Sequence, residues 1–222
     1  MKRIHVLVEG QTEETFVRNL LQPYFWSLGT DLNPVIVVTK RTRSGQTFKG
    51  GITAYTKVRN DIQRLLADTN AVLVTTMLDY YGLPNDFPGY NSLPDGTGYQ
   101  RTQYLTERFK EEINSQRFVP FLMLHEFEAL LFVSPATIAT AFPSVQILDE
   151  FTKIRAKFSS PEEINDGVET HPSARVQKLI QSYQKPLHGS LITQRTGLEL
   201  LRAECSHFNS WLNQLEVIAS GK

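Results

Sequence analysis

The chain has 222 residues and is 41% hydrophobic, which is enough for one large domain with a buried core. It carries 23 Lys and Arg against 23 Asp and Glu, and this balance argues against a generic basic coat for nucleic acid and against a polyacidic tail. The single cysteine, Cys205, excludes an intramolecular disulfide, and no stretch approaches the roughly 18 apolar residues of a membrane span, so we expect a cytoplasmic protein without a membrane segment.

The first half of the chain alternates between strand and helix patterns. Residues 4–8 form a compact apolar run that suits a buried strand, and residues 12–28 repeat apolar side chains at helical spacing. Pro23 is expected to kink or break that helix. A second strand over residues 34–39, a second helix over 53–67 and a third strand over 71–78 follow.

A long loop rich in Gly, Pro, Asn and Asp comes next, over residues 80–98, and its length predicts a functional or mobile segment. A third helix over 99–113, a fourth strand over 117–123 and a helical turn over 124–132 complete the alternation. Beyond residue 133 only helical segments separated by Pro and Gly remain. We therefore expect an α/β domain with a mainly parallel sheet over residues 1–133, and a helical C-terminal lobe packed on it over residues 134–222.

Acidic residues follow three of the predicted strands. Glu9 comes after the first strand, Asp79 after the third, and Glu126 and Glu128 just after the fourth. Because ligands of parallel α/β sheets bind beyond the carboxyl ends of the strands, these carboxylates are expected to converge there and to hold Mg²⁺. The alternative is that Glu9 and Asp79 are ordinary capping residues at strand–helix junctions.

Four segments, taken in order, resemble an uncharacterised bacterial family related to Toprim domains. They are residues 6–13 (VLVEGQTE), 78–82 (LDYYG), 125–131 (HEFEALL) and 161–167 (PEEINDG). The resemblance implies a Toprim-like Rossmannoid fold, proton transfer by Glu9 and metal binding by Asp79. The chain departs from the Asp-x-Asp motif of Toprim domains at Tyr81, so either Glu126 or Glu128 replaces the second Asp, or the metal chemistry has been lost.

A basic stretch adjoins the predicted site. Seven basic residues and one acid lie between residues 40 and 64, and Lys40, Arg41, Arg43 and Lys49 fall in a glycine-containing loop that is expected to grip nucleic-acid phosphates. The alternative is a solvated surface patch. The tyrosines of the 80–104 region, Tyr99 among them, either stack on bases or fasten the loop to the body of the protein.

Together these features predict a Mg²⁺-dependent nuclease acting on DNA or RNA, with Mn²⁺ as a possible substitute. Glu9, Asp79 and Glu126 are the expected catalytic residues, and Glu9, Asp79, Glu126 and Glu128 are the candidate metal ligands. The resemblance further implies a role in bacterial anti-phage defence beside an ABC-type or AAA-type ATPase. The alternative hypothesis is a non-catalytic subunit that binds nucleic acid or the ATPase and whose Toprim site has degenerated.

Overall fold

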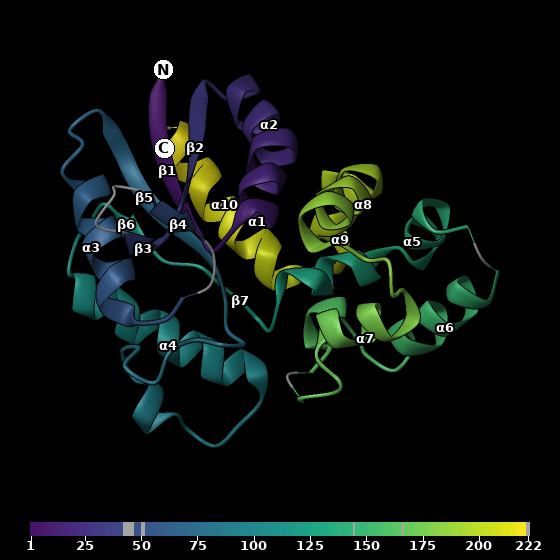
Figure 1. Cartoon of the computed structure of the whole chain (residues 1–222). Helices are drawn as coiled ribbons and strands as arrows, with labels where there is room; N and C mark the ends of the chain where they lie inside the picture. Colours follow the sequence, from purple (N-terminus) through teal and green to yellow (C-terminus); the bar gives the residue numbers. More distant parts are fainter. Residues whose placement is uncertain (42–46, 50–51, 144, 166, 221–222) are drawn as a thin grey trace.

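The structure is a computed structural model that describes residues 1–41, 47–49, 52–143, 145–165 and 167–220 (Figure 1). Its centre is a parallel sheet with the strand order β2 (Thr30–Ile36), β1 (Lys2–Val8) and β5 (Ala71–Asp79). Two short strands, β6 (Phe118–Val119) and β7 (Leu122–Met123), pair with the other edge of β5. The expected α/β class, with a mainly parallel sheet flanked by helices and a helical C-terminal part, is confirmed.

Side chains of β1 alternate between the two faces of the sheet. Ile4, Val6 and Val8 enter one hydrophobic cluster, and Leu7 enters the other. This alternation follows from the pleat of an extended strand. Both faces are therefore buried, which accounts for the nearly continuous apolar run that marks this strand in the sequence.

One face of the sheet is covered by helices from both ends of the chain (Figure 1). These are α1 (Gln11–Phe16), the π-helical turn η1 (Val17–Leu21), α2 (Gln22–Ser27) and the last helix, α10 (Ser206–Ser220). The other face packs against α3 (Tyr55–Leu66) and α4 (Gly98–Ile113), and the loop before α4 contains a short 3-10 turn, η2 (Tyr90–Ser92).

The helix expected over residues 12–28 continues through Pro23 without a break. The π-helical turn η1 precedes α2, and the N–H of Gln22 bonds to the carbonyl of Val17, five residues back. A π-helical turn of this kind accommodates the proline ring because the hydrogen-bond pattern has already shifted before it. Of the two expected outcomes, a kink or a break, the break does not occur for that reason.

Two other predicted elements differ from the structure. The expected strand over 117–123 is split into β6 and β7 around Pro120, which cannot donate to a ladder. The expected loop after the second strand is in part an antiparallel hairpin of β3 (Val38–Arg41) and β4 (Thr47–Lys49).

The helical part beyond the sheet has its own core. It consists of η3 (Phe127–Val133), α5 (Pro135–Ala141), α6 (Val145–Arg155), η4 (Pro161–Glu163), α7 (Pro172–Leu179), η5 (Lys185–Gly189), α8 (Ser190–Thr196) and α9 (Leu198–Glu204). Phe132, Ile138, Phe151 and Ile192 are fully buried there. None of the helices in the described ranges has the length and apolar character needed to cross a bilayer.

The last helix returns from this helical part to the sheet, although the expected division at residue 133 assigned it to the lobe. The indole N–H of Trp211 on α10 donates to the hydroxyl of Thr75 on β5 at 2.9 Å, and the indole ring stacks on Phe121 with ring centroids 4.5 Å apart. The chain thus closes back onto the middle of β5 after building the lobe, which holds the two parts together.

Candidate functional site

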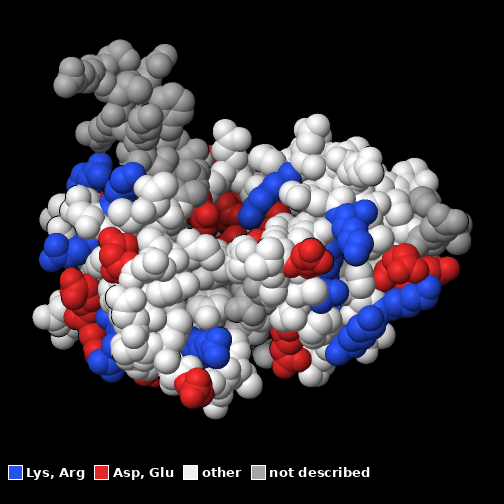
Figure 2. Space-filling view, turned by 60° about the horizontal axis from the view of Figure 1, so that its bottom comes forward, with Lys and Arg blue, Asp and Glu red and all other residues white. Residues whose placement is uncertain are grey.

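The carboxyl ends of β1 and β5 lie side by side, because Val8 pairs with Met77. Glu9 follows β1, Asp79 is the last residue of β5, and Glu128 lies in η3, shortly after β7. Figure 2 shows acidic side chains gathered in a hollow on this face, with a basic side chain beside them. The predicted convergence of acids from separate strands therefore has a counterpart in the folded chain.

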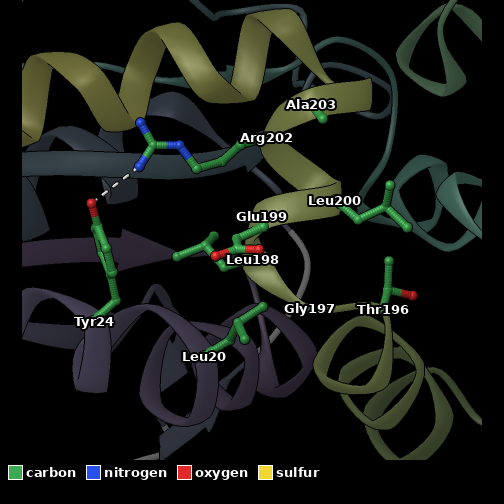
Figure 3. A pocket seen from close by; sticks show the side chains of 9 residues that line it. All are labelled: Leu20, Tyr24, Thr196, Gly197, Leu198, Glu199, Leu200, Arg202 and Ala203. Carbon is green, nitrogen blue, oxygen red and sulfur yellow. Dashed lines mark hydrogen bonds between the residues drawn. The ribbon is translucent and has the colours of Figure 1, made fainter.

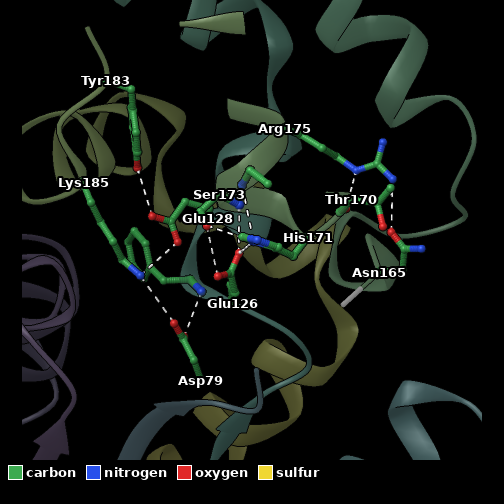
Figure 4. A network of polar contacts seen from close by, with 12 residues as sticks. Asp79, Glu126, Glu128, Asn165, Thr170, His171, Ser173, Arg175, Tyr183 and Lys185 are labelled. Carbon is green, nitrogen blue, oxygen red and sulfur yellow. Dashed lines mark hydrogen bonds and ion pairs between the residues drawn. The ribbon is translucent and has the colours of Figure 1, made fainter. Parts of the chain in front are cut away.

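A lysine from the helical part reaches into this group of acids (Figure 4). The ammonium of Lys185, the first residue of η5, lies 3.0 Å from Glu128 Oε2, 3.4 Å from Asp79 Oδ2 and 3.8 Å from Glu13 Oε1. One positive charge thus lies within 3.8 Å of oxygens from three carboxylates. We call Glu9, Glu13, Asp79, Glu128 and Lys185 the acid cluster.

Each of the three carboxylates paired with Lys185 has a second contact that fixes its position. Asp79 Oδ1 accepts from the N–H of Phe127 at 2.9 Å, and Glu13 Oε2 accepts from the N–H of Gly10 at 2.9 Å. The hydroxyl of Tyr183 donates to Glu128 Oε1 at 3.4 Å. All three acids are buried, and Glu128 has no exposed surface. Their orientation is therefore set by the fold.

Burial dominates the electrostatics of these acids. It raises the pKa of Glu9 to about 7, with the charge of Glu13 adding to the effect, while Lys185 and a hydrogen bond with the backbone of Asp79 oppose it. Burial also raises the pKa of Asp79 well above its usual range, against the opposing charge of Lys185. The pKa of Glu128 is raised for the same main reason. These carboxyl groups lack enough compensating positive charge.

The pKa of Lys185 is also raised, but the cause is the charge of its neighbours and not burial. Burial would lower the pKa of Lys185, but the negative charge of the surrounding carboxylates, Asp79 first, outweighs burial and holds the pKa well above its usual range. Burial, reinforced by the charge of Glu128, raises the pKa of Tyr183. Lys185 therefore stays charged, and Tyr183 stays a neutral hydrogen-bond donor.

The side chains of Glu126 and Glu128 diverge, because Glu126 is the extended residue before η3 and Glu128 lies in the first turn of η3. Glu126 Oε2 accepts from the N–H of Ser173 at 2.8 Å and lies 3.0 Å from His171 Nδ1, at the start of α7. Tyr81 stacks on the His171 ring with centroids 4.6 Å apart. Glu128 thus contacts Lys185, whereas Glu126 anchors α7 next to the cluster, and Tyr81 packs against that anchor.

The acid cluster offers donors suited to a hard divalent cation. All its acceptors are carboxylate oxygens, the ligand type that Mg²⁺ and Mn²⁺ prefer. Among the described residues, the nearest cation to buried Glu128 Oε2 is the ammonium of Lys185, at 3.0 Å. Within the described residues, no set of three or more His, Cys, Asp and Glu already has the spacing of a metal site, and the Lys185 ammonium lies among the acids.

Three members of this arrangement were not predicted from the sequence: Glu13, Lys185 and Tyr183. Glu13 had a signal, because it lies four residues after Glu9 on the helix that begins at the same strand end. Lys185 and Tyr183 had none, since they come from the helical part and more than 100 residues separate Lys185 from Asp79. His125, the other candidate near Glu126, is buried and its ring lies 6.2 Å from that of Tyr80.

The side chains of the four predicted phosphate-gripping residues are outside what the structure describes. Arg43 is not among the described residues. Lys40 and Arg41 are on β3 and Lys49 is on β4, where the backbone is described and the side chains are not. Their contact with nucleic acid stays a prediction.

A wider groove of about 990 Å³ lies away from the acids, between η1, α2 and α9 (Figure 3). Leu20, Tyr24 and Leu198 line it, and its cation, Arg202, already pairs with Glu216 and donates to the Tyr24 hydroxyl at 3.2 Å. Its size alone does not make it the reaction site, because the perturbed acids are elsewhere.

Comparison with known proteins assigns a family. Residues 8–216 match the family described as a domain of unknown function, DUF4276, and the chain therefore belongs to it. No curated protein and no solved structure matches the chain.

Proposed function

We propose that this DUF4276 member is a divalent-metal-dependent phosphodiesterase that cleaves DNA or RNA. The observation that carries the proposal is the position of the Lys185 ammonium within 3.8 Å of three carboxylate oxygens. A point where three carboxylates already hold one cation, at the carboxyl edge of a parallel sheet, is suited to a metal ion as well.

The charge balance of the acid cluster supports this proposal. Four carboxyl groups of the acid cluster surround one ammonium group, and burial raises the pKa of Glu9, Asp79 and Glu128. Buried like charges are costly unless they are protonated or neutralised by a cation. A Mg²⁺ or Mn²⁺ ion would relieve this excess and allow the carboxylates to ionise together.

In this mechanism Asp79, Glu128 and Glu13 would hold the ion. When bound, it would supply Lewis-acid activation of the phosphate and of a water molecule. Glu9, whose pKa of about 7 suits proton exchange near neutral pH, takes a proton from the attacking water. A bond forms between the water oxygen and phosphorus and the P–O ester bond breaks. The leaving oxygen takes a proton from solvent water, and Glu9 afterwards releases its proton to solvent. Lys185, 36% exposed at its side chain, turns from the acids to a non-bridging phosphate oxygen.

The resemblance to Toprim domains supports the same proposal. Glu9 and Asp79 match its proton-transfer and metal positions, and Glu128 is the carboxylate that compensates for Tyr81. By the same resemblance we propose a cytoplasmic effector of anti-phage defence, gated by an ABC-type or AAA-type ATPase.

The test uses the purified chain with Mg²⁺ or Mn²⁺, with and without any ATPase that is encoded beside it. Single-stranded DNA, duplex DNA, RNA and tRNA are the substrates, and Glu9→Gln is compared with the wild type. Glu14→Gln is the matched control, because Glu14 is a nearby acid on α1 that pairs with Arg18 instead of Lys185. Cleavage lost in Glu9→Gln and kept in Glu14→Gln supports the proposal. Equal cleavage by wild type and Glu9→Gln, or no cleavage under all conditions, contradicts it.

One observation favours a second candidate, a non-catalytic binding subunit. Lys185 already provides a cation for the acids, and a permanent ion pair of this kind would leave no need for a metal. Calorimetric titration with Mn²⁺ separates the two candidates. Binding that disappears in Asp79→Ala supports the enzyme, and absence of binding at millimolar Mn²⁺ supports the subunit.

A further inference from the structure

A separate pocket of about 380 Å³ lies between the start of α4 and η4. Its lining includes Gly98 and Tyr99 on α4, His125 just before Glu126, and Phe158 and Asn165 on either side of η4. The carbonyl of His125 accepts from the N–H of Tyr81 at 2.9 Å, two residues after Asp79, so this wall of the pocket lies close to the acid cluster. The chemistry proposed above does not use it.

Two aromatic rings face this pocket. Tyr99 is 51% exposed, and its ring is braced by His207 in an edge contact with centroids 5.6 Å apart. Phe158 carries the guanidinium of Arg175 at 5.7 Å from its ring centroid. An exposed but braced ring offers a flat surface for a planar ligand at a small cost in side-chain entropy.

The polar groups of the pocket are held in place by neighbours. Arg175 donates to Asn165 Oδ1 at 3.1 Å, which fixes the orientation of the amide (Figure 4). The Ser159 hydroxyl donates to Glu163 Oε2 at 2.7 Å. The pocket therefore combines flat apolar surface with a few fixed hydrogen-bonding groups, the usual composition of a small-ligand site.

Glycine at position 98 is needed for the wall that His125 forms. A Cβ atom there would lie 2.7 Å from Cε1 of the imidazole, closer than such contacts allow. The ring of His125 can lie flush against the first turn of α4 because residue 98 has no side chain. The wall is thus a built feature of the fold.

We propose that this pocket receives an unpaired nucleobase next to the phosphate that is cleaved, and that the substrate is accordingly single-stranded nucleic acid. The proposal rests on the proposed function. A pocket of this size, with aromatic surface and fixed polar groups beside a candidate phosphodiester site, fits a planar heterocycle joined to a phosphate. Bases in a duplex are paired and stacked, so they cannot enter it without being extruded.

The test measures binding in EDTA, where no cleavage occurs, with oligonucleotides that carry a fluorescent aminopurine. The ligands are a single strand, its duplex, and a strand of equal length with abasic sites, in DNA and RNA forms. The proteins are wild type, Tyr99→Ala, Tyr99→Phe and Trp26→Ala. Trp26 is the matched control, because it is a 54% exposed aromatic residue on α2, outside the pocket.

We expect Tyr99→Ala to weaken binding of the single strand about fivefold to a hundredfold, the range for loss of one base–aromatic stack. Tyr99→Phe and Trp26→Ala are expected to bind as the wild type does, and the abasic strand is expected to bind weakly to all four proteins. Equal binding of base-containing and abasic strands, tighter binding of the duplex, or equal effects of Tyr99→Ala and Trp26→Ala would overturn the proposal. Base-dependent binding without metal-dependent cleavage would refute the proposed phosphodiesterase activity and leave the nucleobase pocket supported.

Discussion

Replacing Lys185 by methionine tests whether its ammonium occupies the position of a metal ion. A singly charged ammonium and a doubly charged metal ion about 4 Å apart repel each other by about 8 kcal/mol at an effective dielectric constant of about 20. The side chain is 36% exposed and can turn toward solvent when a metal enters, so we retain only about 1.4 kcal/mol of this repulsion. Lys185→Met is therefore expected to bind Mn²⁺ about tenfold more tightly than the wild type.

The assay is isothermal titration of metal-free protein with Mn²⁺, together with thermal unfolding. Without metal, Lys185→Met is expected to be less stable by about 3 kcal/mol, because fully buried Glu128 loses its ion-pair partner. Saturating Mn²⁺ should restore most of this loss. Lys178→Met, which removes an exposed lysine of α7, is the control for a change in net charge. An unchanged or weaker Mn²⁺ affinity in Lys185→Met would refute a shared cation position.

Three further predictions concern single side chains. Asp79→Asn keeps an acceptor for the N–H of Phe127 but removes the charge, so the heat of Mn²⁺ binding should vanish while urea unfolding of the metal-free protein changes little. Trp211→Phe leaves the buried hydroxyl of Thr75 without its donor and should lower the free energy of unfolding by about 2 kcal/mol in urea titrations. Burial raises the pKa of Glu162 from 4.5 to about 7, so the folded state holds a proton that the unfolded state releases. The free energy of unfolding should therefore fall as pH rises from 4.5 to about 7, by up to about 3 kcal/mol, and Glu162→Gln should abolish this part of the dependence.

Much of the fold could be predicted from local patterns. The apolar runs at 4–8 and 71–78 correspond to β1 and β5, because both strands are buried on two faces. The edge strand β2 was harder to delimit, since Asp31 and Asn33 alternate with buried residues in its first half. Two prolines affected their elements differently. Pro120 interrupts the hydrogen-bonded ladder with β5, so the predicted strand is split. Pro23 follows a shift in the hydrogen-bond pattern of its own helix, so that helix continues.

The candidate site could be predicted only as far as strand order determines it. Acids at the ends of adjacent parallel strands meet as a consequence of topology, so Glu9 and Asp79 could be paired without coordinates. The choice between Glu126 and Glu128 depends on the 3-10 geometry of η3 and on contacts with α7, which the residue spacing does not reveal. Lys185 depends on how the helical part folds back on the sheet.

Gly189 shows how that return is controlled. A Cβ atom at this position would lie 3.0 Å from Cγ2 of Thr12 on α1 and 3.3 Å from a ring carbon of Phe127 on η3. The absence of a side chain thus lets η5 pack directly against the two elements that carry Glu13 and Glu128. Lys185 begins the same short turn, so the approach permitted by Gly189 also brings the ammonium within reach of both carboxylates. The charge at the centre of the site is therefore positioned by close backbone packing, a constraint that acid spacing in the sequence does not express.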